Sequence, residues 1–534
     1  MAESFDVVVV GSGASGLTAA LSAAARGRTV LVLEKAPVFG GTSVVSGGSI
    51  WAPANKYAAK VGARDDREDA LAYLRALTLD RVPEELLVRY VDTVNPMLDF
   101  LEGETGLEFT PNMEHPDYQP GLAGARSGGR TIQVGLYDSK RLGETRTDLR
   151  RTHSTVPITK HELDEWGMDT LDRWDWALIA ERTKNHVVGM GAALIGELLE
   201  ACLRHGVKVR TAAPARELVR EGDRVVGVVA DGPDGPERIA ARLGVVLASG
   251  GFEWNETYVD RFLGVPMRAA GSPPANEGDG LRMAMSVGAA LGNMTEAWWC
   301  PMLDVVGDTY DGKPLHRTTS GIRTLPGSLI VNRRGRRFVN EAMNYNDFGK
   351  ALAHFDPVSY EYENLPCWLV FDAKYRASYS VGTLTPDAPK PDWVFEAATL
   401  AELARAIGVD EAGLADEVAR FNENAAKGVD PDFHRGESTY DRYRGDRNNQ
   451  PHRNLGPLGD GPYFAVELHL GCIGTKGGPV VDRDGQVLDA SERPLPGLYA
   501  CGNVAASVFG PAYPGAGATL GAGMTMGYAI GQAI

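Results

Sequence analysis

The sequence predicts an α/β fold in which a Rossmann-like nucleotide-binding domain is interrupted by an inserted α+β capping domain. A continuous apolar run at residues 5–10 is followed by a glycine-rich turn, a helix of small residues and a second apolar strand. Runs that are apolar on both faces are typical of buried parallel strands, and this order forms a βαβ unit. Mixed helical and strand patterns then occupy residues 298–455, and glycine-rich, strand-like sequence returns after them.

These changes of pattern predict the domain boundaries. We expect residues 1–297 and 456–534 to form the nucleotide-binding domain, and residues 298–455 to form the capping, substrate-binding domain. The length of 534 residues suits more than one folding unit.

Composition narrows the possible partners. The chain has 54 Lys and Arg against 70 Asp and Glu, a net charge of −16, which argues against nucleic acid as a partner. Its 5 cysteines are scattered without paired spacing, which indicates reduced thiols. No basic stretch precedes the first apolar run, and no apolar span has transmembrane length. We therefore expect a cytoplasmic protein without a transmembrane segment.

The glycine-rich turn has the spacing of a dinucleotide-binding motif, with glycines at Gly11, Gly13 and Gly16. The first allows the tight turn, the second lets the backbone approach a pyrophosphate, and the third permits close packing of helix on strand. Glu34 ends the second strand, at the position where a carboxylate accepts a hydrogen bond from a ribose hydroxyl. Together they predict a bound dinucleotide.

Further glycine clusters favour FAD over NAD. One follows Glu34, and others lie near Gly250 and Gly502. An NAD domain does not require them, whereas the isoalloxazine end of a flavin needs more backbone beside it. No His or Cys lies within residues 40–48, so we expect the FAD to be bound non-covalently. The full predicted set for FAD is Gly11, Gly13, Ser15, Gly16, Glu34, Lys35, Gly41, Thr42, Ser43, Ser46, Gly47, Gly48, Gly250, Gly251, Gly502, Asn503, Thr519 and Leu520.

These motifs resemble the fumarate reductase/succinate dehydrogenase-type flavoproteins. The resemblance implies FAD and a capping domain that closes over the reactive edge of the flavin. The sequence shows no second glycine motif for a separate NAD(P)H domain, so we expect another electron acceptor, a quinone or a similar compound. His153, His161 and His186 lack metal-ligand spacing, and we predict no metal site.

The C-terminal segment 501–534 contains no charged residue and no His. Fumarate reductases resemble this region but carry a His and an Arg there, because a dicarboxylate needs fixed positive donors. We therefore expect a neutral, apolar carbonyl compound as the substrate.

The segments GTKGG at 474–478, GLY at 497–499 and YPGAGAT at 513–519 resemble the flavin-dependent 3-ketosteroid dehydrogenases, in particular the 1-ene-forming branch. Two further segments agree, HPDY at 115–118 and RRFVNE at 336–341, which leads to Tyr345. The resemblance implies catalytic roles for Tyr118, Tyr345, Tyr513 and the backbone of Gly517.

Such a set suits α,β-desaturation of a ketone. A tyrosine hydroxyl and a backbone N–H stabilise the developing enolate, a second tyrosine removes the α proton, and flavin N5 accepts the β hydride. We expect dehydrogenation of a 3-ketosteroid between C1 and C2. The alternatives are a 4-ene-forming ketosteroid dehydrogenase or a desaturase of another cyclic ketone, a fumarate-type reductase, and a non-catalytic flavin-binding subunit.

Overall fold

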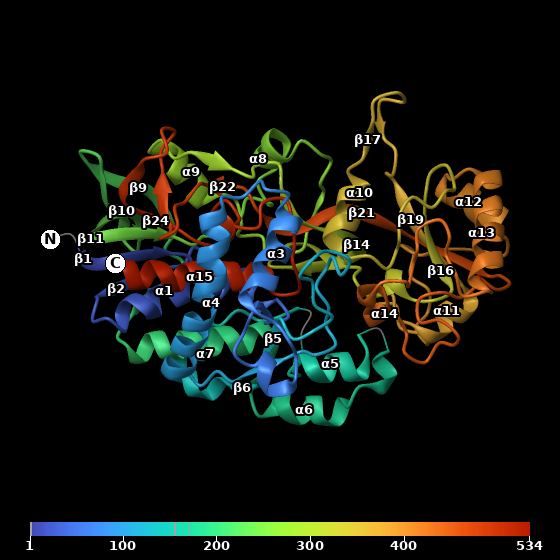
Figure 1. Ribbon diagram of the computed structural model, residues 1–534, viewed down its shortest axis with the longest axis horizontal. Coiled ribbons are helices and arrows are strands. Elements are labelled where there is room, and N and C mark those ends of the chain that lie inside the picture. The colour runs from blue at the N-terminus through green and yellow to red at the C-terminus, as the bar shows by residue number, and fades with distance from the viewer. Residues whose placement is uncertain (1–2, 154–155, 169) are drawn as a thin grey trace.

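The computed structural model describes residues 3–153, 156–168 and 170–534 and contains two large sheets. The first sheet lies at the end of the molecule that holds both termini (Figure 1). Its strand order is β23 (Gln486–Leu488), β24 (Pro494–Ala500), β11 (Gly235–Leu247), β1 (Glu3–Val10), β2 (Val30–Leu33) and β8 (Lys208–Arg210). Strands β9 (Ala215–Glu221) and β10 (Arg224–Gly232) extend it from β11. The pairs from β24 to β8 along this order are parallel, as expected of a Rossmann-like sheet.

The two faces of β1 pack on different layers. Val7 and Val9 belong to the core shared with helices α1 (Ala14–Ala24), α7 (Met190–Arg204) and α15 (Ala518–Ala533). Val8 and Val10 belong to the core shared with β9, β10 and α9 (Asp279–Ser286). Both faces are thus covered, which explains the unbroken run of valines.

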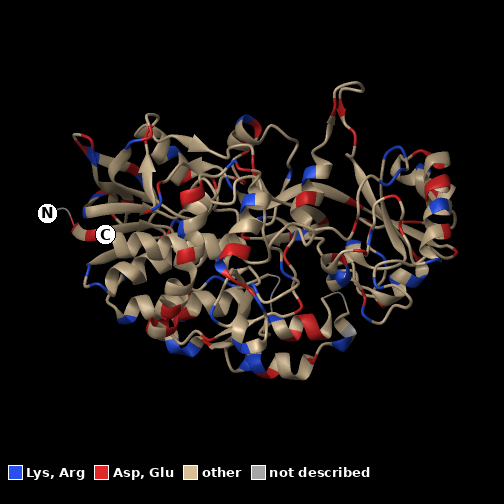
Figure 2. Ribbon diagram, viewed as in Figure 1, with Lys and Arg blue, Asp and Glu red and all other residues tan. Residues whose placement is uncertain are grey.

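Helices α1 and α15 lie in close contact because both are rich in small residues. A side chain at Gly527 would meet the Ser15 carbonyl oxygen at 2.5 Å, and one at Gly531 would meet Ser22 Cβ at 2.4 Å. Helix α15 carries no charged residue and is tan along its length in Figure 2. It brings the C-terminal segment against the first βαβ unit.

The second sheet lies toward the other end of the molecule (Figure 1). Its order is β15 (Lys313–Thr318), β14 (Ala297–Tyr310), β21 (Tyr463–Thr475), β19 (Cys367–Asp372) and β16 (Ser328–Asn332), with β12 (Ala269–Ala270) and β20 (Phe395–Ala397) beside β21. Helices α12 (Leu400–Ile407) and α13 (Glu411–Ala425) cover one face. The central strand β21 comes from the third predicted segment, although it pairs with strands of the second. The domain boundaries at 297 and 455 stay a prediction.

The remaining elements connect or flank these layers. They are α2 (Gly41–Val44), β3 (Ile50–Trp51), η1 (Ala58–Val61), α3 (Arg67–Thr78), α4 (Glu84–Glu104), β4 (Phe109–Pro111), β5 (Thr131–Val134), β6 (Tyr137–Asp138), η2 (Ser139–Asp148), α5 (Lys160–Trp166), η3 (Leu171–Arg173), α6 (Trp176–Lys184), β7 (Val187–Val188), α8 (Glu256–Tyr258), η4 (Val259–Leu263), β13 (Leu291–Gly292), η5 (Ile322–Thr324), α10 (Tyr345–Leu352), β17 (Phe355–Asp356), β18 (Glu361–Tyr362), α11 (Ala373–Ser378), α14 (Thr439–Arg444), β22 (Gly478–Pro479) and η6 (Gly502–Val504).

The observed architecture confirms the predicted fold class, an α/β protein with a Rossmann-like sheet. Among the described residues, no helix has the length and apolar character needed to cross a membrane. All five cysteines are buried and free.

Candidate active site

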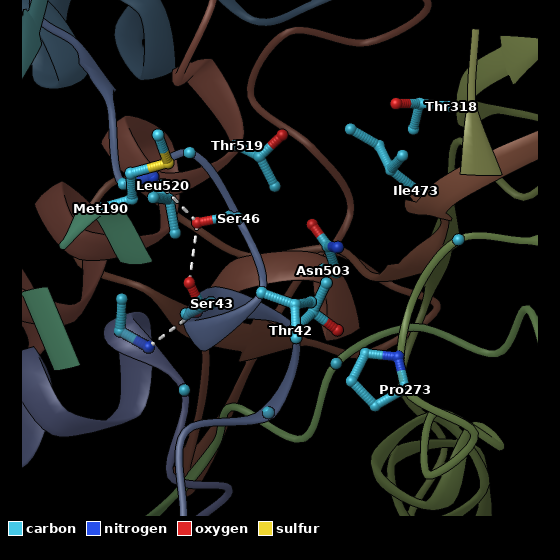
Figure 3. A pocket seen from close by; sticks show the side chains of 18 of the residues that line it. Thr42, Ser43, Ser46, Met190, Pro273, Thr318, Ile473, Asn503, Thr519 and Leu520 are labelled. Atoms are coloured by element: carbon cyan, nitrogen blue, oxygen red, sulfur yellow. Dashed lines mark hydrogen bonds between the residues drawn. The ribbon is translucent and has the colours of Figure 1, made fainter. Parts of the chain in front are cut away.

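A cavity of about 650 Å³ connects the two parts of the molecule. It is lined by the glycine-rich turn after β1, by residues 41–49, by the N-terminal end of α10 and by the segment before α15. Figure 3 shows Thr42, Asn503 and Thr519, which come from distant segments of the chain, around one space. The lining includes all four predicted catalytic residues and every predicted FAD residue except Gly16 and Gly251.

The glycine-rich turn has the geometry that the motif predicts. Gly11 has φ +110°, and a side chain there would meet the Ala248 carbonyl oxygen at 2.3 Å. A side chain at Gly16 would meet the Gly11 carbonyl oxygen at 2.2 Å, so Gly16 serves packing and does not line the cavity. Beside Gly13, in contrast, the nearest atom to a side chain is Ser43 Oγ at 3.4 Å. This opening at the N-terminus of α1 suits a pyrophosphate.

Glu34 is buried at the end of β2 and faces the turn. Its Oε2 accepts hydrogen bonds from Ser12 Oγ at 2.6 Å and from the Ser12 N–H at 3.2 Å. Its Oε1 accepts from the Ala36 N–H at 2.8 Å. These bonds fix the carboxylate, and each oxygen keeps capacity for another donor such as a ribose hydroxyl. Lys35 next to it forms ion pairs with Glu277 and with Asp279, which also lines the cavity.

The segment 41–48 is held by its own hydroxyls. Ser43 Oγ accepts from the Ala14 N–H at 3.0 Å, and Ser46 Oγ donates to the Ser43 carbonyl at 2.7 Å (Figure 3). Asn276 donates to Thr42 Oγ1 at 2.9 Å. The sequence analysis missed Asn276, because the SPPANEG segment around it resembles an ordinary loop.

Three tyrosine hydroxyls meet at the other end of the cavity. Tyr118 donates to the Tyr345 hydroxyl at 3.0 Å, and Tyr345 donates to the Tyr513 hydroxyl at 3.1 Å. Thr519 Oγ1 donates to the Tyr513 hydroxyl at 3.3 Å. The structure thus brings together residues from three distant segments of the chain.

The three tyrosines are held by local structure. Asn344 caps α10 by accepting from the Asp347 N–H, which places Tyr345 in the first helical turn. The Tyr118 N–H donates to the Pro514 carbonyl at 3.0 Å, which joins the loop of Tyr118 to the loop of Tyr513. Burial raises the pKa of each of the three hydroxyls above its ordinary value, so all three are neutral near pH 7 in this structure.

Gly517 precedes α15 and has a left-handed backbone with φ +88°. A side chain there would meet the Ser49 carbonyl oxygen at 2.3 Å, so this approach requires glycine. Among the described residues, the Gly517 N–H has no acceptor. It is available, beside the Tyr513 hydroxyl, as a second donor to a carbonyl oxygen.

Lys476 is a buried residue that is hydrogen-bonded to the backbone at this end of the cavity. Its Nζ donates to the Ala512 carbonyl at 2.8 Å and to the Pro511 carbonyl at 3.3 Å, just before Tyr513. It also lies 4.5 Å from the ring centre of Trp298, whose Nε1 donates to Asn503 Oδ1. The sequence analysis used Lys476 only as part of the GTKGG segment, since a single lysine there gives no sign of being buried.

The cavity is less neutral than the uncharged C-terminal segment suggested. Arg150, Lys160, Arg317 and Arg444 line it, and the sequence analysis assigned none of these four side chains to the site. Three of these pair with carboxylates: Arg150 with Asp311, Lys160 with Asp164 and Arg317 with Asp308.

A Rossmann-like sheet with this glycine-rich cradle, beside a cluster of hydroxyl groups, defines a dinucleotide-dependent oxidoreductase. The family model described as FAD binding domain matches residues 6–520, and the chain belongs to this family. The cofactor is therefore FAD, as the glycine clusters predicted.

Individual relatives agree with this assignment. The chain is 44% identical to a 4-oxocyclohexanecarboxylate 2-dehydrogenase of Sinomonas cyclohexanicum, over 99% of this chain and 92% of the relative. It is 39% identical to a 3-oxosteroid 1-dehydrogenase of Mycobacterium tuberculosis, over 98% of this chain and 97% of the relative. A 3-ketosteroid delta1-dehydrogenase from Sterolibacterium denitrificans, solved with 1,4-androstadiene-3,17-dione, superposes with a TM-score of 0.93 at 36% identity, covering 99% of each chain. The predicted resemblance and the class of enzyme, an FAD-dependent oxidoreductase acting on CH–CH groups, are confirmed.

Proposed function

We propose that the protein introduces a C=C bond α,β to the carbonyl of a ring ketone, with Tyr345 as the base and Tyr513 and the Gly517 N–H as donors to the ketone oxygen. The single observation that carries this proposal is the hydrogen-bonded chain Tyr118–Tyr345–Tyr513 in a cavity continuous with the FAD cradle. Bound FAD supplies the hydride acceptor.

Each tyrosine has a distinct task in the proposal. Tyr513 and Gly517 stabilise the enolate oxygen, which acidifies the α C–H. Tyr345 takes the α proton on its phenolic oxygen, and the electron pair of that C–H bond forms the C=C bond as the β C–H bond breaks, with its hydride going to the acceptor that FAD would supply. Tyr118, which donates to the Tyr345 oxygen, stabilises the phenolate that must exist before the proton is taken.

We propose 3-ketosteroids, desaturated between C1 and C2, as a first substrate class, since relatives named for this reaction match nearly the whole chain. The 44%-identical relative is named for an oxocyclohexane carboxylate, and the cationic cavity lining favours such a compound as the second candidate. A quinone or similar compound is our proposed electron acceptor, and a cytoplasmic location is supported by five free, buried cysteines.

Anaerobic mixing of the holoenzyme with ring ketones tests the proposal. An enzyme of this kind loses the flavin absorbance near 450 nm, whereas a passive flavin-binding subunit keeps it. Product analysis after turnover with an artificial acceptor then separates 1-ene from 4-ene formation. Fumarate, offered to the reduced enzyme, tests the fumarate-type alternative. If none of a panel of steroidal and monocyclic ketones bleaches the flavin, the proposal fails.

A further inference from the structure

We propose that Arg444 binds a carboxylate on the ring-ketone substrate, which favours the oxo acid, the second of the two proposed substrate classes, over a neutral ketone. The inference rests on the proposed function and adds the substrate class and the residue that selects it. It starts from a cationic side chain that the desaturation chemistry does not use.

Arg444 is the last residue of α14 and lines the same cavity as Tyr118, Tyr345 and Tyr513. Its Nε is buried and has no hydrogen-bond partner. Among the side chains that the structure describes, no carboxylate lies within ion-pair distance of its guanidinium. A half-buried guanidinium whose Nε has no partner and which lacks a counter-ion is costly, and a ligand anion would offset that cost.

Other cations that line the cavity have carboxylate partners, so the lack of one is specific to Arg444. Arg317 Nη2 lies 2.6 Å from the carboxylate of Asp308, and Arg150 and Lys160 also have carboxylate partners. Asp164 is the acid whose charge acts on Arg444, but it already pairs with Lys160 and accepts from Asn112. Around Arg444 the positive charge therefore exceeds the negative charge.

The surroundings of Arg444 are aromatic and mostly apolar. The guanidinium lies 5.3 Å from the ring centre of Tyr443, and the His115 ring lies 4.5 Å from that of Tyr443. Burial, and after it the charge of Arg444, lower the pKa of His115 to about 3, so His115 is neutral and adds no competing charge. A guanidinium in such a site binds a carboxylate through two parallel hydrogen bonds, with little competition from water.

The position also suits the proposed chemistry. Arg444 is close enough to Tyr118 for its charge to lower the pKa of that hydroxyl against the larger, opposing effect of burial. Tyr118 in turn contacts both other tyrosines, with ring centres 5.4 Å from Tyr345 and 5.0 Å from Tyr513. A substrate with its ketone at Tyr513 and its carboxylate at Arg444 would span one continuous cavity.

A ligand that cannot react separates binding from turnover. Cyclohexanecarboxylate carries the anion but no ketone, and 4-methylcyclohexanone carries a ketone but no anion. We expect cyclohexanecarboxylate to perturb the spectrum of the oxidised holoenzyme, and Arg444→Met to weaken its binding about 10- to 100-fold, the loss of a hydrogen-bonded charge pair. Arg444→Lys should retain part of the affinity. Binding of 4-methylcyclohexanone should change less than threefold.

Arg442→Met is the matched control, since Arg442 lies on the same helix but is exposed and bonds to backbone carbonyls of residues 436 and 437. Equal losses for the acid and the neutral ketone in Arg444→Met would overturn the inference, because the residue would then act on the site as a whole. So would unchanged binding of the acid.

A comparison in the wild type covers the case in which Arg444→Met does not fold. We expect kcat/KM for 4-oxocyclohexanecarboxylate to exceed that for its methyl ester at least tenfold. An ester used as well as the acid contradicts the role of Arg444 and leaves the proposed desaturation intact. Failure of every ring ketone to reduce the flavin contradicts the proposed function itself.

Discussion

The Tyr345 hydroxyl donates to the Tyr513 hydroxyl at 3.1 Å, although the two residues lie 168 positions apart in the chain. Tyr345 begins α10, whose Gly349 packs directly on Trp299 of β14. Tyr513 lies in the loop before α15, which packs on the first βαβ unit. The bond therefore joins the second sheet to the Rossmann-like domain, and a shift between these parts would separate the two hydroxyls.

Tyr513→Phe should lower kcat about 10²–10³-fold, because it removes one donor to the enolate oxygen. It keeps the aromatic ring, whose centre lies 4.6 Å from the ring centre of Trp298. FAD content should not change. Tyr137→Phe is the control, since Tyr137 is also a buried tyrosine but bonds to Glu200 outside the cavity. Turnover is measured with an artificial acceptor, and near wild-type turnover of Tyr513→Phe would remove this residue from the mechanism.

Tyr345→Phe separates proton removal from carbonyl binding. The variant should bind ketone, because Tyr513 and the Gly517 N–H remain, but it should not exchange the α hydrogen with deuterated solvent. It should also fail to reduce the flavin. Exchange is followed by NMR of the recovered ketone. Wild-type exchange in Tyr345→Phe would transfer the role of base to Tyr118, its hydrogen-bond donor.

The pH dependence follows from the buried tyrosines. Burial, and then the neighbouring Tyr118 and Tyr513, raise the pKa of Tyr345 well above 10. The base is active only when deprotonated, so below that pKa its active fraction rises about tenfold per pH unit. We expect log kcat/KM to rise across pH 6–9.5 without a plateau, and the apparent pKa to belong to the coupled tyrosines. A plateau beginning near pH 7 would contradict the assignment.

Cofactor binding is tested at Gly11. A side chain at this left-handed position would lie 2.3 Å from the Ala248 carbonyl oxygen, so Gly11→Ala should abolish FAD binding or the fold. Gly27→Ala is the control, because Gly27 also has a positive φ but no atom lies within 4 Å of its side-chain position. The 450 nm to 280 nm absorbance ratio of the purified proteins measures FAD content.

The mode of FAD attachment is a separate prediction. The segment 40–48, most of which lines the cavity, contains neither His nor Cys. Acid precipitation should therefore release the yellow chromophore into the supernatant. Colour that stays in the pellet would show a covalent bond.

Local patterns were enough to predict much of the fold. The valine run of β1 and the glycine spacing identify the βαβ unit, because these features depend on neighbours in sequence. The pairing of β21 with β14 and β19 joins residues that lie 91 to 178 positions apart in the chain, and no local pattern encodes it. The predicted boundary at 456 follows a change of composition and not this pairing.

The candidate site also contains residues that a local sequence pattern identifies and residues that only the folded chain brings to it. Motif residues such as Tyr513 and Gly517 could be identified, because their segment has a recognisable sequence. Arg444 lies in the charged segment TYDRYRGD, which is typical of a solvated helix, and only the folded chain turns it toward the cavity. The expectation of a neutral, apolar substrate was based on the C-terminal segment alone, and that segment does not include Arg444.

Lys476 provides the last prediction. Its burial lowers its pKa to about 7, while in the unfolded chain it titrates near 10.5. Between these values the unfolded state binds more protons than the folded state, so the stability contributed by Lys476 rises with pH. The Tm of the wild type minus that of Lys476→Met should therefore increase from pH 7 to pH 10. Lys476→Met should also lower kcat, because the Ala512 carbonyl loses its donor next to Tyr513.

The matched control is Lys350→Met, which removes a partly exposed donor to the neighbouring Pro511 carbonyl. Circular dichroism melts of both variants and the wild type at pH 7, 8, 9 and 10 give the comparison. A difference for Lys476→Met that stays constant over this range would mean that Lys476 remains protonated in the folded protein. Its hydrogen bonds to the backbone before Tyr513 would then be those of an ammonium group at every pH tested, and the loss of kcat in Lys476→Met should not vary over this range.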